Sequence, residues 1–184
     1  MTGSGHPEYD TLYGPDRPAI ALLGGLPPPY GGYSTYVKLL YESSLAERFG
    51  YAHIDTSHAS LGSGLVRAAN LARLIARDFV RFRRAMHVKS VRAIHMVVEY
   101  NVRRFRQHSL FFDWAGRKGW ARIFDIRAGG FIRFAETAPE HLQLRLGEVL
   151  RAAEAVTVEG LPYVDYVRQR WDVRAIYMPN FIRW

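Results

Sequence analysis

The sequence predicts an α/β protein built on an open, mainly parallel β-sheet with helices on both faces. Short continuous apolar runs such as "AIALL" are typical of strands buried on both faces. Segments with helical spacing of apolar residues separate these runs, and 184 residues give room for one well-buried domain. Because strands that alternate with helices form right-handed βαβ units, the sheet is expected to be parallel and doubly wound.

The first strand is expected over residues 19–25, followed by a loop with two glycine pairs and three prolines. Helical spacing then resumes, and Ser34 is the expected N-cap because a serine side chain accepts a hydrogen bond from the first free N–H groups of a helix. The loop therefore joins a strand to a helix. The apolar positions of that helix are Val37, Leu40, Tyr41, Leu45 and Phe49.

The same alternation continues to the end of the chain. Thr137 and Glu140 have the spacing of a capping box, which predicts a helix from there to about Ala153. The other expected strands, which bring the total to six, cover 51–57, 91–100, 120–131, 155–160 and 173–178, and the other helices cover 64–87, 104–117 and a short stretch after Pro162.

Residues 18–178 are expected to form the domain. Residues 1–17 are rich in Gly, Pro and Asp without periodicity, which predicts a mobile tail. No apolar run approaches the roughly 20 residues that cross a bilayer, and the start has no signal-peptide pattern, so a cytoplasmic protein is expected. The absence of cysteine excludes disulfides and thiolate chemistry, and is compatible with a reducing compartment.

The positive charge is concentrated in one part of the chain. The net charge is +8, and residues 66–106 hold 11 Lys and Arg against two acidic residues, whereas the rest of the sequence is nearly balanced. This distribution favours a single anionic partner over general basicity.

Three loops are candidate ligand-binding loops: residues 24–32, 98–101 and 127–130. In open α/β sheets, ligands bind beyond the carboxyl ends of the strands, near the point where the strand order reverses. In the first loop, glycine lets the backbone approach a ligand, and free N–H groups after Gly32 favour a phosphate or a carboxylate. A plain turn is the alternative, and the pattern matches neither the dinucleotide nor the P-loop motif. The candidate ligand residues of this loop are Tyr30, Gly31, Gly32 and Ser34.

The other two loops add candidate substrate-binding residues. Arg127, at a strand end before Gly129 and Gly130, would hold a phosphate or carboxylate through two parallel hydrogen bonds. The alternative is an ion pair with Glu136 or Glu99. Glu99 and Tyr100 would hydrogen-bond a hydroxylated substrate, although surface capping residues give the same pattern.

The helix expected over 64–87 is amphipathic. One interpretation of its arginines is a solvated face, and the other is attachment to anionic lipid head groups, at about 1 kcal/mol per basic residue. Nucleic acid is not favoured, because the aromatic residues lie on the face expected to be buried, where they cannot stack on bases. The apolar face, expected to pack on the sheet, holds Leu65, Ala68, Ala72, Ile75, Phe79, Phe82 and Met86, and the opposite side holds Arg73, Arg77, Arg81 and Arg84.

No metal site is expected. His53, Asp55 and His58 are metal-binding residue types, but they straddle a strand end and a loop and lack a fourth ligand. The sequence also has no serine-hydrolase elbow, no zinc-protease helix motif and no carboxylate pair for a metal-diphosphate complex.

The stretch "LLGGLPPPYGGYSTYVKLLYESSLAERFGY" resembles the opening of the N-terminal domain of family 4 glycosyltransferases. These enzymes have the GT-B fold, made of two Rossmann-like domains. The similarity continues through "ARIFDIRAGGF", "RAAEAVTVEG" and "YMPNFI", so it covers about Pro18 to Ile182.

The resemblance implies the acceptor-side half of a retaining, metal-independent transferase that uses a nucleotide-sugar in polysaccharide or glycolipid synthesis. Gly31 and Gly32 would approach the diphosphate of the donor or the acceptor. The family often has a histidine where this chain has Arg127, which suggests a subfamily that binds an anionic group. Some relatives act on lipid-linked acceptors and dock on membranes, so a peripheral location on the inner face of the cell membrane is expected, through Arg73 to Arg84.

The resemblance also implies a second domain that carries the nucleotide-sugar pocket. Residues 179–184 would begin the interdomain linker, so the chain alone is expected to be inactive, and the donor domain would act in cis or in trans. Two alternatives stay open. One is a non-catalytic basic module that binds an anionic membrane or a partner protein, and the other is a nucleotide-binding oxidoreductase or other Rossmann enzyme.

Overall fold

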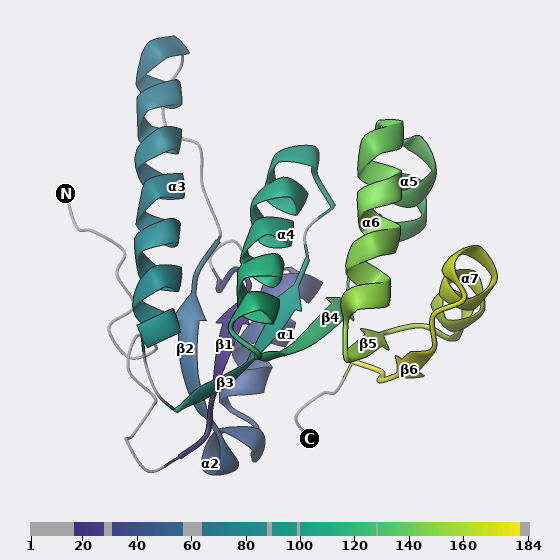
Figure 1. Ribbon diagram of the computed structural model, residues 1–184, viewed down its shortest axis with the longest axis horizontal. Coiled ribbons are helices and arrows are strands. Elements are labelled where there is room, and N and C mark those ends of the chain that lie inside the picture. The colour runs from purple at the N-terminus through teal and green to yellow at the C-terminus, as the bar shows by residue number, and fades with distance from the viewer. Residues whose placement is uncertain are drawn as a thin grey trace.

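The protein is a six-stranded, all-parallel sheet with helices on both faces (Figure 1), as the sequence predicts. The computed structural model describes residues 17–27, 31–56, 64–87, 90–98, 100–127 and 129–180.

All six expected strands are present, in the spatial order β2-β1-β3-β4-β5-β6. The chain moves from β1 to β2 on one side and then returns to β3 on the other side of β1. The strand order therefore reverses between β1 and β3, and a ligand crevice is expected at their carboxyl ends. The strands are β1 (Ala19–Leu23), β2 (Gly50–Ile54), β3 (Val91–Val97), β4 (Ala121–Ile126), β5 (Ala155–Val158) and β6 (Ala175–Tyr177).

The helices differ from the sequence expectation in two places. The first expected helix ends early at Tyr41, where Ser43 donates a hydrogen bond to the Leu40 carbonyl at 2.7 Å, and a separate four-residue turn follows. The expected capping box at Thr137 is also wrong, because Thr137 ends an unexpected helix and donates to the Arg133 carbonyl at 2.8 Å. The helices are α1 (Gly32–Tyr41), α2 (Leu45–Arg48), α3 (Gly64–His87), α4 (Val102–Arg117), α5 (Phe131–Thr137), α6 (Glu140–Ala152) and α7 (Leu161–Trp171).

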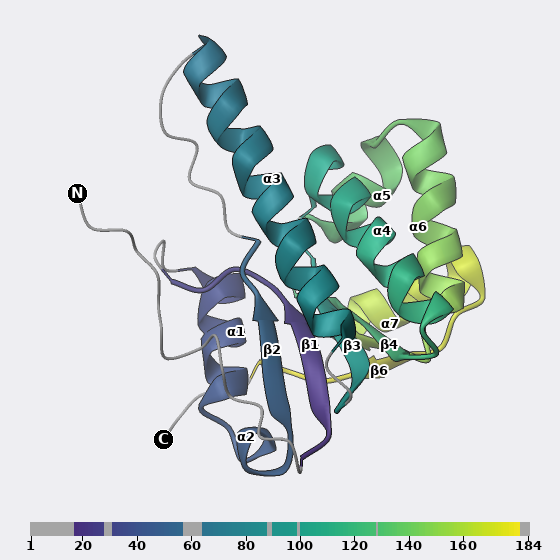
Figure 2. The same cartoon turned by 60° about the vertical axis from the view of Figure 1, so that its left-hand side comes forward.

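The two faces of the sheet are covered unequally. Helix α1 covers one face, where Leu22, Tyr51 and Val97 of the strands pack against Val37 and its neighbours. The other face carries the larger core, to which α3 through α7 all contribute (Figure 2). On the α1 side, the outer strand β6 leaves Ile176 52% exposed, so that part of the sheet has no helix over it in the described chain.

Helix α3 projects beyond the sheet, which corrects the expectation for its apolar face. Its 24 residues span roughly 36 Å at 1.5 Å per residue, whereas a five-residue strand spans only about 17 Å. The N-terminal half therefore has no sheet to pack on (Figures 1 and 2). Leu65 is 89% exposed and Ala68 and Ala72 are also exposed, whereas Phe82, near the other end, is fully buried.

Two helical glycines give a matched pair of stability predictions. An added Cβ at Gly147 would lie 2.7 Å from the Trp171 ring, which is rigid and buried, so we expect Gly147→Ala to cost about 1 to 3 kcal/mol. At Gly116 the close atom is the flexible end of Arg122, at 2.6 Å, and we expect Gly116→Ala to be nearly neutral because alanine favours the helix. Urea denaturation measures both, and equal losses would contradict the packing argument.

Candidate ligand site at the carboxyl edge of the sheet

Asp125 is the centre of a buried polar cluster near the carboxyl end of β4. The Tyr36 hydroxyl donates to Asp125 Oδ2 at 2.8 Å, and His95 Nε2 lies 2.8 Å from the same oxygen. Arg127 Nε donates to Asp125 Oδ1 at 2.7 Å. A carboxylate only accepts hydrogen bonds, so His95 Nε2 carries the proton. Asp125 has no exposed surface, and these three donors are the compensation that its charge requires.

The sheet itself brings these residues together. Side chains alternate between the two faces of a strand, so Asp125 and Arg127 point to the same side of β4. Val97 of β3 pairs with Asp125, which puts His95, two residues earlier, on that side as well. This is the face that α1 covers, and Tyr36 comes from α1.

The charge on Asp125 is stabilised by its neighbours. Burial works to raise the pKa of Asp125, but the hydrogen bond and charge of His95 and the charge of Arg127 outweigh burial and hold the pKa below its usual value. Burial and the nearby Asp125 raise the pKa of Tyr36 well above its ordinary value. At neutral pH the cluster therefore consists of a carboxylate, a neutral phenol and a guanidinium.

Arg127 is enclosed by this cluster. Its side chain has no exposed surface, and its guanidinium carbon lies 4.1 Å from the centre of the Tyr36 ring. Nη1 donates to the Met178 carbonyl and, at 3.4 Å, to Asn180 Oδ1. Among the described residues, the ion-pair partner is therefore Asp125 and not Glu136, whereas Glu99 lies outside the described residues. In this conformation Arg127 holds the end of β4 to residues 178–180 and does not face solvent.

The loop after β1 is closed at its start and open at its end. The Gly25 N–H donates to the Tyr33 hydroxyl at 3.0 Å, and that hydroxyl donates to the Val97 carbonyl at 3.0 Å. In contrast, Gly31 and Gly32 are exposed, and an added Cβ at either would meet no atom within 4 Å. Any backbone contact with a ligand is therefore expected at the second glycine pair. Tyr30 lies outside the described residues.

Ser34 is the third residue of α1, so the expectation that it is the N-cap is wrong. The N-cap is Gly31, in extended backbone. Ser34 still binds this residue, because the Gly31 N–H donates to Ser34 Oγ at 3.1 Å and the Ser34 hydroxyl donates back to the Gly31 carbonyl at 3.3 Å. Ser34 is buried and shapes the loop from inside.

The loops after β3 and β4 lie together. The ring of Tyr100 packs 5.3 Å from Phe131 and 5.8 Å from Phe134, and its Cβ is 3.9 Å from where a Cβ of Gly130 would lie. The Tyr100 hydroxyl is buried and has no hydrogen-bond partner among the described residues, and burial raises its pKa well above the ordinary value. Gly129 and Gly130 are exposed. Glu99 lies outside the described residues.

Of the residues considered for a metal site, His53 is bonded to the backbone of the first loop. His53 Nε2 lies 2.8 Å from the carbonyl oxygen of Gly24, which ties β2 to the first loop. His58 lies outside the described residues. Within the described ranges, no three His, Asp or Glu side chains are grouped so that they would hold a metal ion.

The four arginines expected to form a stripe on α3 fall into two groups. Arg73 and Arg84 are exposed. Arg77 donates to the Asp55 carbonyl at 3.3 Å and pairs with buried Asp78 at 3.3 Å, and Arg81 is half-buried. Only the first group is open to a large anionic surface. No described helix is long and apolar enough to cross a membrane.

Sequence reasoning missed Asp125, His95 and Tyr36. A polar residue within a buried apolar strand was the available signal, since Asp125 interrupts "ARIFDI" and His95 interrupts "VRAIHMV". Tyr36 gave no such signal, because a tyrosine in an amphipathic helix usually belongs to the core.

No family model matches the chain, and no curated protein or solved structure was found to be similar to it. The function is therefore inferred from the arrangement at the carboxyl edge.

Proposed function

We propose that this chain is the acceptor-side half of a retaining, metal-independent glycosyltransferase that uses a nucleotide-sugar donor. The observation that carries the proposal is the exposed pair Gly31 and Gly32 at the start of α1, beside the point where the strand order reverses. The start of a helix has N–H groups without partners within the helix, and these attract phosphate. The resemblance to family 4 glycosyltransferases favours this ligand class over other anions.

In this proposal the two exposed glycine pairs have different roles in binding. Gly31 and Gly32 approach the diphosphate or the phosphate of a lipid-linked acceptor, and Gly129 and Gly130 let a sugar approach the end of β4. Arg127 does not contact the ligand while residues 178–180 cover it. It is a positioning residue that holds the end of β4 in place. A second domain, in the same chain or a separate one, supplies the nucleotide-sugar pocket, and the product enters polysaccharide or glycolipid synthesis at the inner face of the membrane.

An NMR titration tests the proposal. Nucleoside diphosphate sugars and a short-chain prenyl phosphate are added to the ¹⁵N-labelled chain, and we expect shifts at the amides of the two open glycine pairs. Nicotinamide dinucleotide is the comparison ligand. Stronger shifts with this dinucleotide would favour the oxidoreductase alternative, and no shift with any ligand would contradict the proposal.

Gly32→Ala separates ligand binding from folding. The added Cβ meets no atom within 4 Å and alanine favours a helix, so we expect a thermal midpoint equal to that of the wild type or slightly higher. If Gly32 gives a phosphate access to the backbone, the same variant should bind the phosphate ligands about tenfold more weakly, or weaker still. The concentration dependence of the amide shifts measures this affinity. A control glycine-to-alanine change cannot be made at Gly119, because Gly119 has a positive φ that strains alanine. Unchanged ligand shifts in Gly32→Ala would remove the loop from the site.

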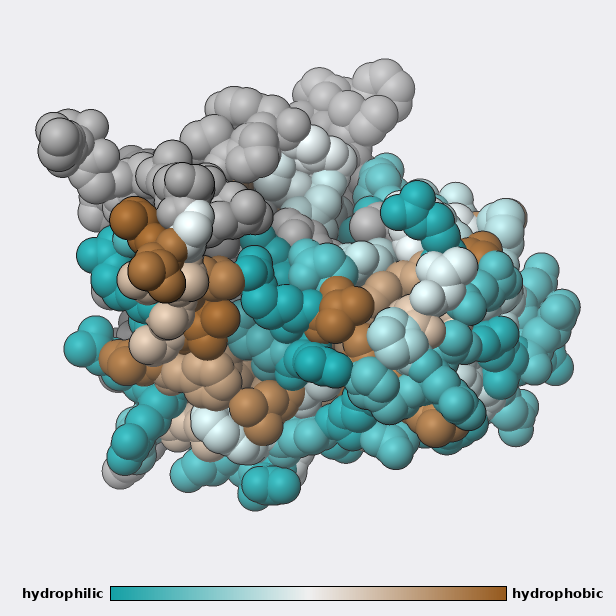
Figure 3. All heavy atoms as spheres, turned by 90° about the horizontal axis from the view of Figure 1, so that it is seen from above, coloured by the Kyte–Doolittle hydropathy of each residue, from teal (hydrophilic) through white to brown (hydrophobic). Residues whose placement is uncertain are grey.

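A second candidate is a non-catalytic basic module that binds an anionic membrane or a partner. The projecting half of α3 favours it, because hydrophobic residues gather at that end of the helix (Figure 3), with Leu65 89% and Val66 63% exposed. Arg73 lies exposed two turns further on. Equal binding of the chain to anionic and neutral liposomes would contradict the membrane form of this candidate.

A further inference from the structure

A cavity of about 410 Å³ lies between the C-terminal ends of α3 and α4. Each of these helices leads into the strand that follows it, so the cavity lies at the amino edge of the sheet, opposite the candidate ligand site. Its volume is typical of pockets that hold a small molecule or part of one. The residues that line it are Arg83, Met86, His87, Trp114, Arg117 and Lys118.

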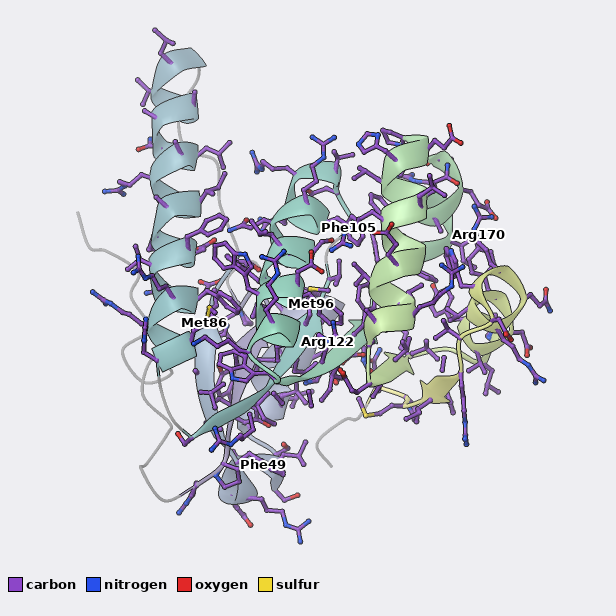
Figure 4. The ribbon with its side chains drawn as sticks, viewed as in Figure 1. Phe49, Met86, Met96, Phe105, Arg122 and Arg170 are labelled. Atoms are coloured by element: carbon purple, nitrogen blue, oxygen red, sulfur yellow. The ribbon has the colours of Figure 1, made fainter. Side chains whose placement is uncertain are left out.

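The floor of the cavity is apolar. Met86 lies on the side of α3 that faces α4 (Figure 4), and both Met86 and Trp114 are half-buried against the larger core. The Trp114 ring lies 5.6 Å from Phe79 and 6.1 Å from Phe82, between ring centres. These contacts fix the ring, so the floor is a preformed surface.

The rim of the cavity is cationic. Arg83, Arg117 and Lys118 are exposed, His87 is exposed beside them, and no acidic side chain is among the described residues that line the cavity. The partial negative charge of a helix C-terminus favours a basic residue in the last turn. That effect accounts for His87, Arg117 and Lys118, the C-cap of α4, but Arg83 lies one turn before the end of α3. The excess of positive charge calls for an anionic ligand.

We propose that this cavity holds one anionic phospholipid, with its phosphate on the cationic rim and the start of an acyl chain on Met86 and Trp114. A lipid matches both parts of the cavity, whereas a free inorganic anion would leave the apolar floor uncovered. Exposed apolar side chains also lie next to the cavity. Val80 is 50% exposed one turn before Arg83 in α3, and Leu110 is 37% exposed one turn before Trp114 in α4. The proposal goes beyond sugar transfer and places lipid contact on a surface other than the arginine stripe.

Fluorescence quenching tests the contact with Trp114. The full chain is mixed with vesicles of phosphatidylglycerol whose acyl chains carry bromine, which quenches a tryptophan only at close range. Because Trp184 lies outside the described residues, the test uses the Trp184→Phe variant, in which we expect quenching that adding Trp114→Phe removes. Trp120 and Trp171 are buried and contribute little. Quenching that survives in Trp114→Phe/Trp184→Phe would overturn the proposal.

Charge variants test the rim. We expect Arg83→Gln/Arg117→Gln/Lys118→Gln to lower binding to phosphatidylglycerol vesicles about 100-fold, from roughly fivefold for each basic residue. Arg151→Gln/Arg168→Gln/Arg174→Gln removes the same charge from exposed positions elsewhere and should change binding far less. Arg73→Gln/Arg84→Gln tests the stripe on α3 in the same way. Equal losses in the rim and control variants would overturn the proposal, because they would show a response to net charge alone.

Soluble ligands separate a lipid from a free anion. A short-chain phosphatidic acid below its micelle concentration should shift the amides of the cavity residues, and inorganic phosphate at the same concentration should shift them far less. Equal shifts with both would overturn the lipid assignment and leave a plain anion site. No sugar substrate enters these measurements, so their failure is distinct from failure of the proposed transferase function.

Discussion

Asp125→Asn is expected to lower the free energy of unfolding by about 3 to 5 kcal/mol. The carboxylate accepts hydrogen bonds from Tyr36, His95 and Arg127 and has no exposed surface. Asparagine has the same shape but no charge, so the buried Arg127 guanidinium loses its counter-ion. Urea denaturation followed by circular dichroism measures the loss.

The control for this prediction is Asp165→Asn. Asp165 is exposed on α7, so the same chemical change there should alter the free energy of unfolding by less than about 0.5 kcal/mol. Similar losses at both positions would contradict a special role for Asp125.

The pH dependence gives a second check on Asp125. The pKa of Asp125 is lower in the folded protein than its usual value. Its contribution to stability is therefore complete above the unfolded pKa of about 4, and is lost as the pH falls through the lower folded pKa. The wild type should lose stability below about pH 4 more steeply than Asp125→Asn, and parallel curves would show that Asp125 does not carry this dependence.

The sheet could be predicted from the sequence because each strand is a nearly continuous apolar run bounded by glycine, proline or polar residues. Helix α3 could be predicted with the same bounds, since residues 64–87 contain no internal proline or glycine. Helix α5, of seven residues, was missed because so short a segment gives less than two turns of periodicity, whereas α2, of four residues, was predicted as the end of the first helix. The capping-box pattern at Thr137 was misleading because a serine or threonine also bonds back to a carbonyl one turn earlier.

The candidate site could be predicted only in part. The two glycine pairs could be predicted as ligand-binding positions, because an apolar run that ends in glycines shows in the sequence where a strand ends. The cluster around Asp125 depends on contacts between distant parts of the chain, since Tyr36 and Asp125 are 89 residues apart. Which face of α3 is buried also depended on the rest of the fold: the helix is longer than the strands, so its first turns have nothing to pack on, although their spacing is amphipathic. The apolar side chains of these first turns are exposed because α3 is longer than the strands, which the spacing of its apolar residues does not reveal.

Arg127→Met is expected to cost about 3 kcal/mol, because it leaves the Asp125 carboxylate buried with one fewer compensating charge. The double variant Asp125→Asn/Arg127→Met should lose less than the sum of the two single losses, by about 2 kcal/mol or more, since neither charge is then left alone. Additive losses in urea denaturation would show that the ion pair does not couple the two residues.

The double variant also decides what Arg127 does at the site. Arg127→Ala or Arg127→Met alone confounds ligand binding with folding, because the lone Asp125 charge destabilises the end of β4. With both charges removed, no lone charge is left buried at the end of β4, and the guanidinium is absent from the site. Because residues 178–180 cover Arg127, we expect ligand-dependent shifts at Gly31 and Gly32 to persist in the double variant. Their loss, in a double variant that circular dichroism shows to be folded, would show that residues 178–180 move away and that Arg127 contacts the ligand directly.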